Sequence, residues 1–310
     1  MAESIIYSIS DLDEYSPKPA VNFIFAYAEE KRSSTVIDHL INKGTCIENV
    51  IIIIYNNHSI PKELEMRFEK SNTFFVHLSR EPMDFISELK SIPKSFWSDN
   101  LLIDMSCIRI PELFTLLKYI KVQGLIKHVD ISYSIPFDYV FYKEPFTSFR
   151  SYNGDLKMYE LLGFSGPGQI LEYQNLYLFL GFEGALGLKV FENCQYSNLF
   201  LINCLPSFFP KYKDISVINN YQLLQEKHTF LYTPADNPYE VYNLLDSLIG
   251  NKENSVCIAP LSTKPVALGI CMFALEHDFV RIVYPVPVSN DYLMDNTLDI
   301  YRTNIYSIDL

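Results

Sequence analysis

The chain contains little glycine, at 11 of its 310 residues. It carries neither a Gly-x-Gly-x-x-Gly fingerprint nor a Walker-type phosphate loop, so the common glycine-rich nucleotide motifs are excluded. Long apolar runs are also missing. The longest, such as Val50–Tyr55, are far too short to cross a bilayer and fit buried strands instead. We therefore expect no membrane partner.

Positive charge is in deficit. Lys and Arg number 25 against 37 Asp and Glu, which gives a net charge of −12 and a pI near 5.0. A protein that binds long nucleic acid normally presents a basic face to the phosphates, so binding to long DNA or RNA is not expected. A small anionic ligand stays open, because one helix N-terminus and one cation can hold a phosphate.

Metal-binding and disulfide patterns are absent as well. The six Cys include no Cys-x-x-Cys pair, and the six His are scattered, so no metal and no cofactor is predicted. The segment Met1–Tyr15 is acidic and has no basic start of the kind that opens a signal peptide. These features together predict a reduced, cytoplasmic protein.

An internal repeat is the most informative feature that is present. Asn, Pro and Lys recur at a fixed offset of 149, as Asn49/Asn198, Pro61/Pro210 and Lys62/Lys211. Further on, Tyr133 and Pro136 recur as Tyr284 and Pro287 at an offset of 151. A fixed-period match between non-apolar residues favours duplication of one unit. The alternative is two α/β domains that share a pattern without common descent.

The predicted fold class is α/β, with two tandem Rossmann-like units that have parallel sheets and are related by internal duplication. Short β-branched runs alternate with helical segments in both halves, as expected for βαβ units. The expected organisation is an N-terminal arm (1–19), unit 1 (20–141), a connector (142–174), unit 2 (175–294) and a C-terminal tail (295–310).

Candidate site residues follow from the rule that ligands bind beyond the carboxyl ends of parallel strands. The loop after the first strand of each unit carries a carboxylate at an equivalent place, Glu29 and Glu183. Such a pair is a candidate for acid/base catalysis or for binding ribose hydroxyls. The alternative is a carboxylate that stabilises the helix dipole.

The loops after the predicted strands Asn100–Met105 in unit 1 and Val256–Ala259 in unit 2 hold hydroxyls and a cation next to a helix start. These candidate ligand-binding residues are Ser106 and Arg109 in unit 1, and Ser262, Thr263 and Lys264 in unit 2. Together with helix amides they form a possible anion cradle, with simple helix capping as the alternative. Because two hydroxyls adjoin Lys264, the second copy is expected to be the better anion holder.

Two further positions complete the candidate set. Tyr133 and Tyr284 stand at the ends of the last strands, where a tyrosine can stack on a base or terminate a strand in a rigid turn. His58 lies in the loop after the second strand and is a weaker candidate for a catalytic base.

The run Ser262–Gly269 followed by Val280–Tyr284 resembles a loop, helix and strand of CARF-type domains. These are Rossmann-like sensors of cyclic oligonucleotides in prokaryotic antiviral systems. The resemblance implies that Thr263 and Lys264 open a helix beneath a ligand, in a pocket that the family builds from two protomers. The chain departs from the family pattern in having Leu261 and Ser262 in place of two glycines, and no effector domain is recognisable.

Three functions are therefore predicted as alternatives. The first is a sensor or binding protein for a nucleotide or nucleotide-like anion, in an antiviral or signalling setting that only the resemblance implies. The second is a hydrolase acting on nucleosides or nucleotides, with Glu29 or Glu183 as its acid/base group. The third is an accessory subunit that binds a protein partner through its aromatic surface.

Overall fold

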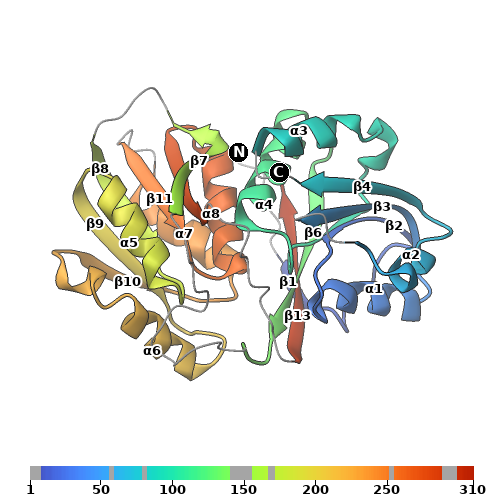
Figure 1. Cartoon of the computed structure of the whole chain (residues 1–310), viewed down its shortest axis with the longest axis horizontal. Coiled ribbons are helices and arrows are strands. Elements are labelled where there is room, and N and C mark those ends of the chain that lie inside the picture. The colour runs from blue at the N-terminus through green and yellow to red at the C-terminus, as the bar shows by residue number, and fades with distance from the viewer. Residues whose placement is uncertain are drawn as a thin grey trace. The chain divides into compact units, whose positions relative to one another are not determined.

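The structure is a computed structural model, and it describes residues 8–55, 59–78, 82–139, 156–166, 172–250, 255–287 and 299–310. It divides into two compact units (Figure 1). Unit 1 comprises Met1–Val140 together with Met294–Leu310, and unit 2 comprises Phe141–Leu293. Both are α/β, as the sequence predicts.

Unit 1 is built on a seven-stranded sheet in the order β1-β13-β6-β5-β2-β3-β4. The strands are β1 (Ser8–Asp11), β2 (Ala20–Ala26), β3 (Cys46–Tyr55), β4 (Asn72–Leu78), β5 (Leu101–Asp104), β6 (His128–Pro136) and β13 (Ile300–Asp309). The helices are α1 (Arg32–Asn42), α2 (Lys62–Arg67), α3 (Pro82–Ser91) and α4 (Ile110–Val122), with a 3-10 turn at Lys94–Phe96.

Unit 2 is built on a six-stranded sheet in the order β10-β9-β8-β11-β12-β7. The strands are β7 (Leu156–Ser165), β8 (Tyr173–Phe179), β9 (Tyr196–Cys204), β10 (Thr229–Thr233), β11 (Val256–Pro260) and β12 (Val280–Pro287). The helices are α5 (Gly184–Asn193), α6 (Pro210–Asn219), α7 (Pro238–Leu248) and α8 (Lys264–Glu276), with a 3-10 turn at Leu223–Gln225.

The two sheets share one topology. Five parallel strands, numbered by their order along each unit, lie in the order 3-2-1-4-5, and the strand order reverses between strands 1 and 4. This order matches five of the six strands of the Rossmann arrangement 3-2-1-4-5-6. The chain therefore consists of two tandem Rossmann-like units, and the prediction of fold class is confirmed. The reversal point lies between β2 and β5 in unit 1, and between β8 and β11 in unit 2.

Each fifth strand gains an antiparallel neighbour that the sequence did not reveal. β7 pairs with β12, and β13 pairs with β6. Each added strand has ten residues and begins opposite the last proline of its partner: Leu156 lies opposite Pro287, and Ile300 opposite Pro136. The strand that follows β6 along the chain thus completes unit 2, whereas the strand that follows β12 completes unit 1.

This pairing changes the expected boundaries. The predicted C-terminal tail contains β13, which lies inside the sheet of unit 1 between β1 and β6. The predicted arm contains β1, and the predicted connector contains β7. The helix α6 and the strand β10 of unit 2 were not predicted either.

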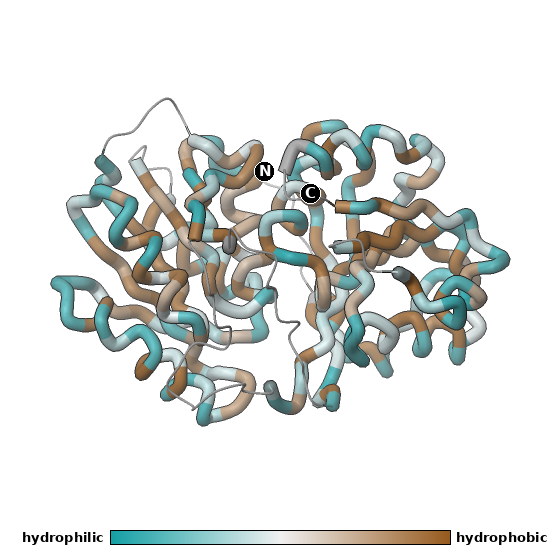
Figure 2. The backbone as a smooth tube through the Cα atoms, in the orientation of Figure 1, coloured by the Kyte–Doolittle hydropathy of each residue, from teal (hydrophilic) through white to brown (hydrophobic). Residues whose placement is uncertain are grey.

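The parallel strands form the core because their side chains are buried on both faces. Val50–Ile53 and Phe23–Phe25 are at most 1% exposed. Figure 2 shows hydrophobic stretches along the strands of both units and hydrophilic stretches in many of the connecting loops. Burying one large apolar side chain stabilises a fold by roughly 1.5–3 kcal/mol.

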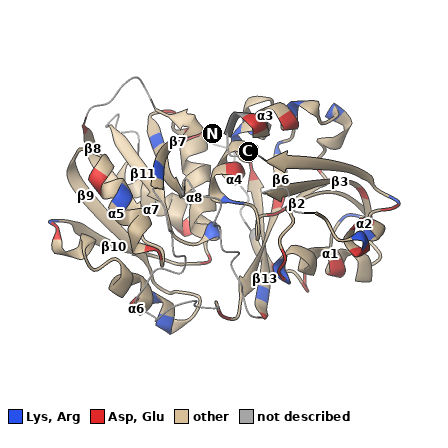
Figure 3. Ribbon diagram, viewed as in Figure 1, with Lys and Arg blue, Asp and Glu red and all other residues tan. Residues whose placement is uncertain are grey.

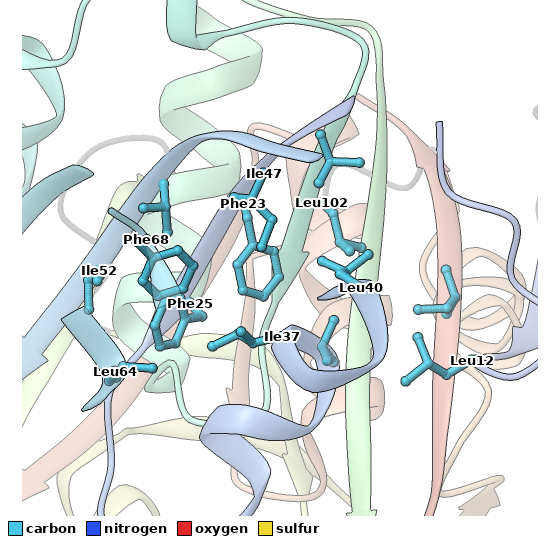
Figure 4. Close-up of a cluster of buried hydrophobic side chains, with 14 of the residues drawn as sticks. Leu12, Phe23, Phe25, Ile37, Leu40, Ile47, Ile52, Leu64, Phe68 and Leu102 are labelled. Atoms are coloured by element: carbon cyan, nitrogen blue, oxygen red, sulfur yellow. The ribbon is translucent and has the colours of Figure 1, made fainter. Parts of the chain in front are cut away.

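In unit 1, the helix α1 covers one face of β2 and β3 (Figure 4). Ile37 and Leu40 of the helix lie over Phe23 and Phe25 of the strand, with Phe68 beside Phe25 at a ring-centroid distance of 5.9 Å. This packing fixes the start of α1 at the carboxyl edge of the sheet.

In unit 2, the helix α8 is apolar almost throughout, and every residue from Pro265 to Leu275 is buried. A Cβ atom at Gly269 would lie 2.2 Å from the carbonyl oxygen of Pro238, so only glycine permits this close approach of α7 and α8. Lys264 is consequently held at the edge of the sheet.

Among the described residues, no helix is both long enough and apolar enough to span a membrane.

Candidate functional site

The carboxyl edge of the unit 1 sheet brings together polar side chains from several loops. The loop after β2 ends at the start of α1, and the loop after β5 ends at the start of α4. These two loops flank the point where the strand order reverses, which is where open α/β sheets bind ligands. Residues 56–58 of the loop after β3, which include His58, lie outside the described residues.

A buried ion pair stands at the centre of this edge. Glu30 Oε1 accepts hydrogen bonds from Arg32 Nε at 3.0 Å and from Arg32 Nη2 at 2.7 Å. Both side chains are nearly inaccessible, at 5% exposed for Arg32 and 8% for Glu30. Within the described part of the chain, the third guanidinium nitrogen, Nη1, makes no hydrogen bond. Arg32 therefore retains a donor for another acceptor.

The groups around Arg32 stabilise its positive charge. Burial alone lowers its pKa, but the Glu30 carboxylate, the Cys107 thiol and the Tyr133 and Tyr139 hydroxyls raise it, and the pKa ends well above its ordinary value. Arg32 thus stays charged. The predicted residue Tyr133 is 2% exposed and belongs to this cluster.

Cys107 lies between the buried ion pair and Arg109, the second cation at this edge of the sheet. Its Sγ donates to Glu30 Oε1 at 3.0 Å, and it lies close enough to Tyr55 to raise the pKa of that hydroxyl, which burial raises most. The Tyr55 hydroxyl in turn accepts from the backbone N–H of Arg109 at 3.0 Å. The Arg109 guanidinium lies 3.9 Å from the centre of the Tyr55 ring.

The stacking of Arg109 on Tyr55 is a cation–π contact. It holds the guanidinium at the end of β3 and at the N-terminus of α4, where Arg109 is the N-cap. The predicted residue Arg109 therefore belongs to the same edge as Arg32, through the chain Arg32, Glu30, Cys107 and Tyr55.

Ser106 has a structural role in this arrangement. It is fully buried, its N–H donates to Asp104 Oδ1 at 3.0 Å, and its hydroxyl accepts from the N–H of Ser134 at 2.8 Å. Ser134 Oγ lies 2.9 Å from Thr303 Oγ1 of β13. Ser106 thus fastens the loop after β5 to β6 and does not present its oxygen at the surface.

The equivalent edge of unit 2 is filled by the protein's own backbone. A Cβ atom at Gly181 would lie 2.0 Å from the carbonyl oxygen of Leu261, and one at Gly184 would lie 1.8 Å from that of Asn219. The Gly181 carbonyl also accepts from Ser216 and Asn220 at 3.1 and 2.8 Å. The small residues of this loop therefore allow α6 and the loop after β11 to approach closely.

The hydroxyls of the unit 2 candidate cradle are likewise used within the protein. Thr263 is the N-cap of α8, accepting from the N–H of Val266 at 3.4 Å and donating to the carbonyl of Ala235 at 2.6 Å. Ser262 Oγ lies 3.1 Å from Cys204 Sγ. Lys264 occupies the first turn of α8, half-buried. This geometry fits the capping alternative.

The two copies differ most at the buried ion pair. At the offset of 154 that relates Phe25 to Phe179, Glu30 corresponds to Gly184 and Arg32 to Leu186 (184−30 and 186−32). Leu186 is buried in the apolar core of unit 2. The expectation that the second copy is the better anion holder is therefore not supported by the geometry, which favours unit 1.

The structure also gives the environments of the remaining predicted residues. Glu29 is exposed, and Glu183 is half-buried at the N-cap of α5 without a capping hydrogen bond from its side chain. Tyr284 packs against the core of unit 2. Glu30 and Arg32 were missed because a charged run, Glu29–Arg32, gives no sign in sequence of which members turn inward.

Charge and metal chemistry are limited in the described residues. Within them, no group of three His, Cys, Asp or Glu side chains is arranged to hold a metal ion. In the view of Figure 3, Lys and Arg are dispersed among many elements and do not collect on one.

Comparison with known proteins adds little to this picture. No family model matches the sequence, and no curated protein matches it. Among solved structures, one similar chain is a universal stress protein from Archaeoglobus fulgidus DSM 4304, at 9% identity and a TM-score of 0.24, with 84% of this chain and 95% of that chain covered. The fold assignment accordingly rests on the strand order of the two sheets.

Proposed function

We propose that the protein binds a nucleotide or nucleotide-like anion at the carboxyl edge of unit 1. The observation that supports this most is the buried Arg32, whose Nη1 has no acceptor among the described residues although Nε and Nη2 are held by Glu30. A guanidinium kept in a fixed orientation by a carboxylate presents its remaining donors with little entropic cost.

Each member of the edge has a part in this proposal. Arg32 donates from Nη1 to an anionic oxygen, and Arg109, held against Tyr55, supplies a second positive charge. Tyr133 and Tyr139 place hydroxyls near enough to Arg32 to raise its pKa. Glu30 positions Arg32, since its Oε1 already accepts three hydrogen bonds.

A sensor or binding role is preferred over hydrolysis on the same grounds. Glu30 is committed to Arg32 and Cys107, and Glu29 is exposed to water, so neither is placed as a buried acid/base group. We extend the proposal to a cytoplasmic protein because its composition is acidic and its cysteines are not joined in disulfides. A defence or signalling setting is supported by the CARF resemblance alone.

The experiment is a thermal-shift panel on the full chain with mononucleotides, cyclic oligonucleotides and inorganic phosphate. Ligand at about 100 times its Kd stabilises by roughly 2.7 kcal/mol, which raises the Tm of a unit of this size by about 5–10 °C. Arg32→Lys, which keeps the charge but loses the fork, should reduce the shift. Lys264→Ala in unit 2 is the matched control and should keep it.

Two results would overturn the proposal. One is a panel in which no nucleotide raises the Tm of the wild-type chain. The other is a shift that survives Arg32→Lys unchanged and disappears in Lys264→Ala, which would place the ligand in unit 2.

A further inference from the structure

A second cluster of reactive side chains lies at the amino ends of the unit 2 strands. Cys257 is the second residue of β11, and Arg281 is the second residue of β12. The two are partners in the parallel register of these strands, so their side chains are neighbours on one face of the sheet. That face is the one covered by α5, because Cys257 and Val283, two residues beyond Arg281, both belong to the core beneath that helix.

Cys194 reaches the same place from the helix. It is the C-cap of α5, the crossover between the parallel strands β8 and β9. A crossover helix runs back along the sheet, so its last turn lies over the amino ends of the strands. Cys194 is half-buried and packs against the core cluster that contains the fully buried Cys257. The two thiols lie near enough to each other that each shifts the pKa of the other.

Arg281 is built into the cluster. It is 6% exposed, its Nε donates to the carbonyl of Ser165 at 2.6 Å, and its Nη1 donates to Glu160 Oε1 at 3.0 Å and to the Tyr173 hydroxyl at 3.2 Å. Glu160 comes from β7 and Tyr173 from β8. The charged and titratable groups that face the thiols are therefore Arg281, Glu160 and Tyr173.

The environment makes the two thiols unequal. The Cys257 thiol lowers the pKa of Cys194, and Arg281 lowers it further, against the opposing effects of burial and of Glu160. Burial raises the pKa of Cys257 well above its ordinary value. A half-buried, thiolate-prone sulfur next to a fully buried thiol is the arrangement of an attacking and a resolving cysteine.

We propose that Cys194 and Cys257 are an oxidation site, a dithiol that a hydroperoxide closes to a disulfide. The site is separate from the Arg32 edge: it lies in unit 2, at the amino ends of the strands. It uses two of the six cysteines, none of which is in a disulfide in the reduced protein.

The chemistry balances with the hydroperoxide as the only co-reactant. The Cys194 thiolate attacks the terminal peroxide oxygen, forming an S–O bond while the O–O bond breaks, and the departing oxide is protonated to water or alcohol. Cys257 sulfur then attacks Cys194 sulfur, the S–O bond breaks, and the leaving hydroxide takes the Cys257 proton as water. Two thiols lose two electrons in total, and the peroxide gains them.

The experiment treats the full-length reduced protein with hydrogen peroxide, blocks the remaining thiols with N-ethylmaleimide, and maps peptides by mass spectrometry without reduction. The expected result is a Cys194–Cys257 linked peptide as the main product, reversible with dithiothreitol. Cys46, which is exposed in unit 1, is the internal reference for reagent access. Cys46→Ser should leave the linkage unchanged.

Two variants keep the test independent of folding. In Cys257→Ser, which replaces one thiol by a hydroxyl of similar size, Cys194 should stop as a sulfenic acid that dimedone traps. In Arg281→Lys, alkylation of Cys194 at neutral pH should slow several-fold relative to Cys46, with far-UV circular dichroism unchanged. The proposal is overturned if wild-type Cys194 stays reduced while Cys46 oxidises, or if Cys194 is over-oxidised without linkage to Cys257.

Discussion

At the residue scale, the neighbouring residues Lys31 and Arg32 each form an ion pair with a carboxylate, one exposed to solvent and the other buried. Lys31 pairs with Asp299 at 2.5 Å, with side chains 65% and 71% exposed, whereas the pair of Arg32 and Glu30 is buried. Exposed pairs contribute little, but removal of one partner of a buried pair leaves a charge without compensation. Arg32→Ala should therefore lower the free energy of unfolding by about 3–5 kcal/mol, and Lys31→Ala should leave it near the wild-type value.

Urea denaturation of the two variants measures this difference. Equal stabilities for Lys31→Ala and Arg32→Ala would show that the Glu30–Arg32 pair is not buried as described. Restoring a buried cation with Arg32→Lys should recover part of the loss, because the charge of Glu30 is again compensated.

Gly184 gives a second contrast of this kind. Gly184→Ala would place a Cβ atom 1.8 Å from the carbonyl oxygen of Asn219, so the backbone of α5 or α6 must move. We expect a loss of about 3 kcal/mol or more in the free energy of unfolding. Gly44→Ala, where φ is +73° and no atom lies within 4 Å, should cost only about 1–2 kcal/mol. Similar losses from both, in chemical denaturation, would contradict the tight contact of Gly184 with Asn219.

His39 is expected to make the stability of the fold depend on pH. Burial lowers the pKa of His39, and Lys43 adds to this, against Asp13 and Asp11. Its Nε2 is buried and has no hydrogen-bond partner within the described residues. Because the folded-state pKa lies below the unfolded value of about 6.5, the unfolded chain takes up the proton first as the pH falls. The stability associated with neutral His39 is thus present above about pH 6.5 and is lost as the pH falls through the folded-state pKa.

Denaturation of wild type and His39→Gln at about pH 7.5 and about pH 5 tests this sign. The variant should lose less stability on acidification than the wild type. An equal or larger loss in His39→Gln would mean that His39 is not the group that titrates.

At the element scale, β13 is the clearest test of the architecture. It lies between β1 and β6, so its backbone is paired on both sides, and Ile305 and Ile308 are at most 1% exposed. Ile305→Ala should lower the free energy of unfolding by about 2–5 kcal/mol. Tyr301 is 54% exposed, so Tyr301→Ala should lower it much less. Hydrogen exchange should localise the loss from Ile305→Ala to β1 and β6. A loss spread equally over β8 and β9 of unit 2 would contradict this assignment.

The parallel strands other than β10 could be predicted from the sequence, whereas the antiparallel strands β7 and β13 could not. A continuous apolar run such as Val50–Tyr55 is diagnostic because both faces of the strand are buried. The strands β7 and β13 mix polar and apolar residues, and their partners are remote: Ile305 lies opposite Ser132. Pairing at that sequence separation leaves no local pattern to read.

The site shows the same division. Arg109 and Tyr133 could be predicted from their places at strand ends, where parallel sheets collect their loops. The inward turn of Glu30 and Arg32 could not, because it depends on the contact of Cys107 with Glu30 across two loops. The glycines of unit 2 also mark close approaches, and here the approaching group is the protein's own carbonyl.

At the scale of the whole molecule, the chain contains two units with the same sheet topology but different residues at the carboxyl edges of the sheets. Both sheets have the same strand order, and each is completed by a strand that follows the other unit's last parallel strand. Within this shared frame, unit 1 has Glu30 and Arg32 where unit 2 has Gly184 and Leu186. The two units therefore share their sheet topology and differ in the loops that carry polar side chains.

The most direct test of the central claim is isothermal titration of the nucleotide that stabilises the wild-type chain most, into Arg109→Ala and Lys264→Ala. Loss of one charged contact is worth about 1.5–3 kcal/mol, or roughly 10–100-fold in Kd. The account predicts that Arg109→Ala weakens binding by that factor and that Lys264→Ala leaves the Kd unchanged. An unchanged Kd in Arg109→Ala together with weakened binding in Lys264→Ala would contradict it.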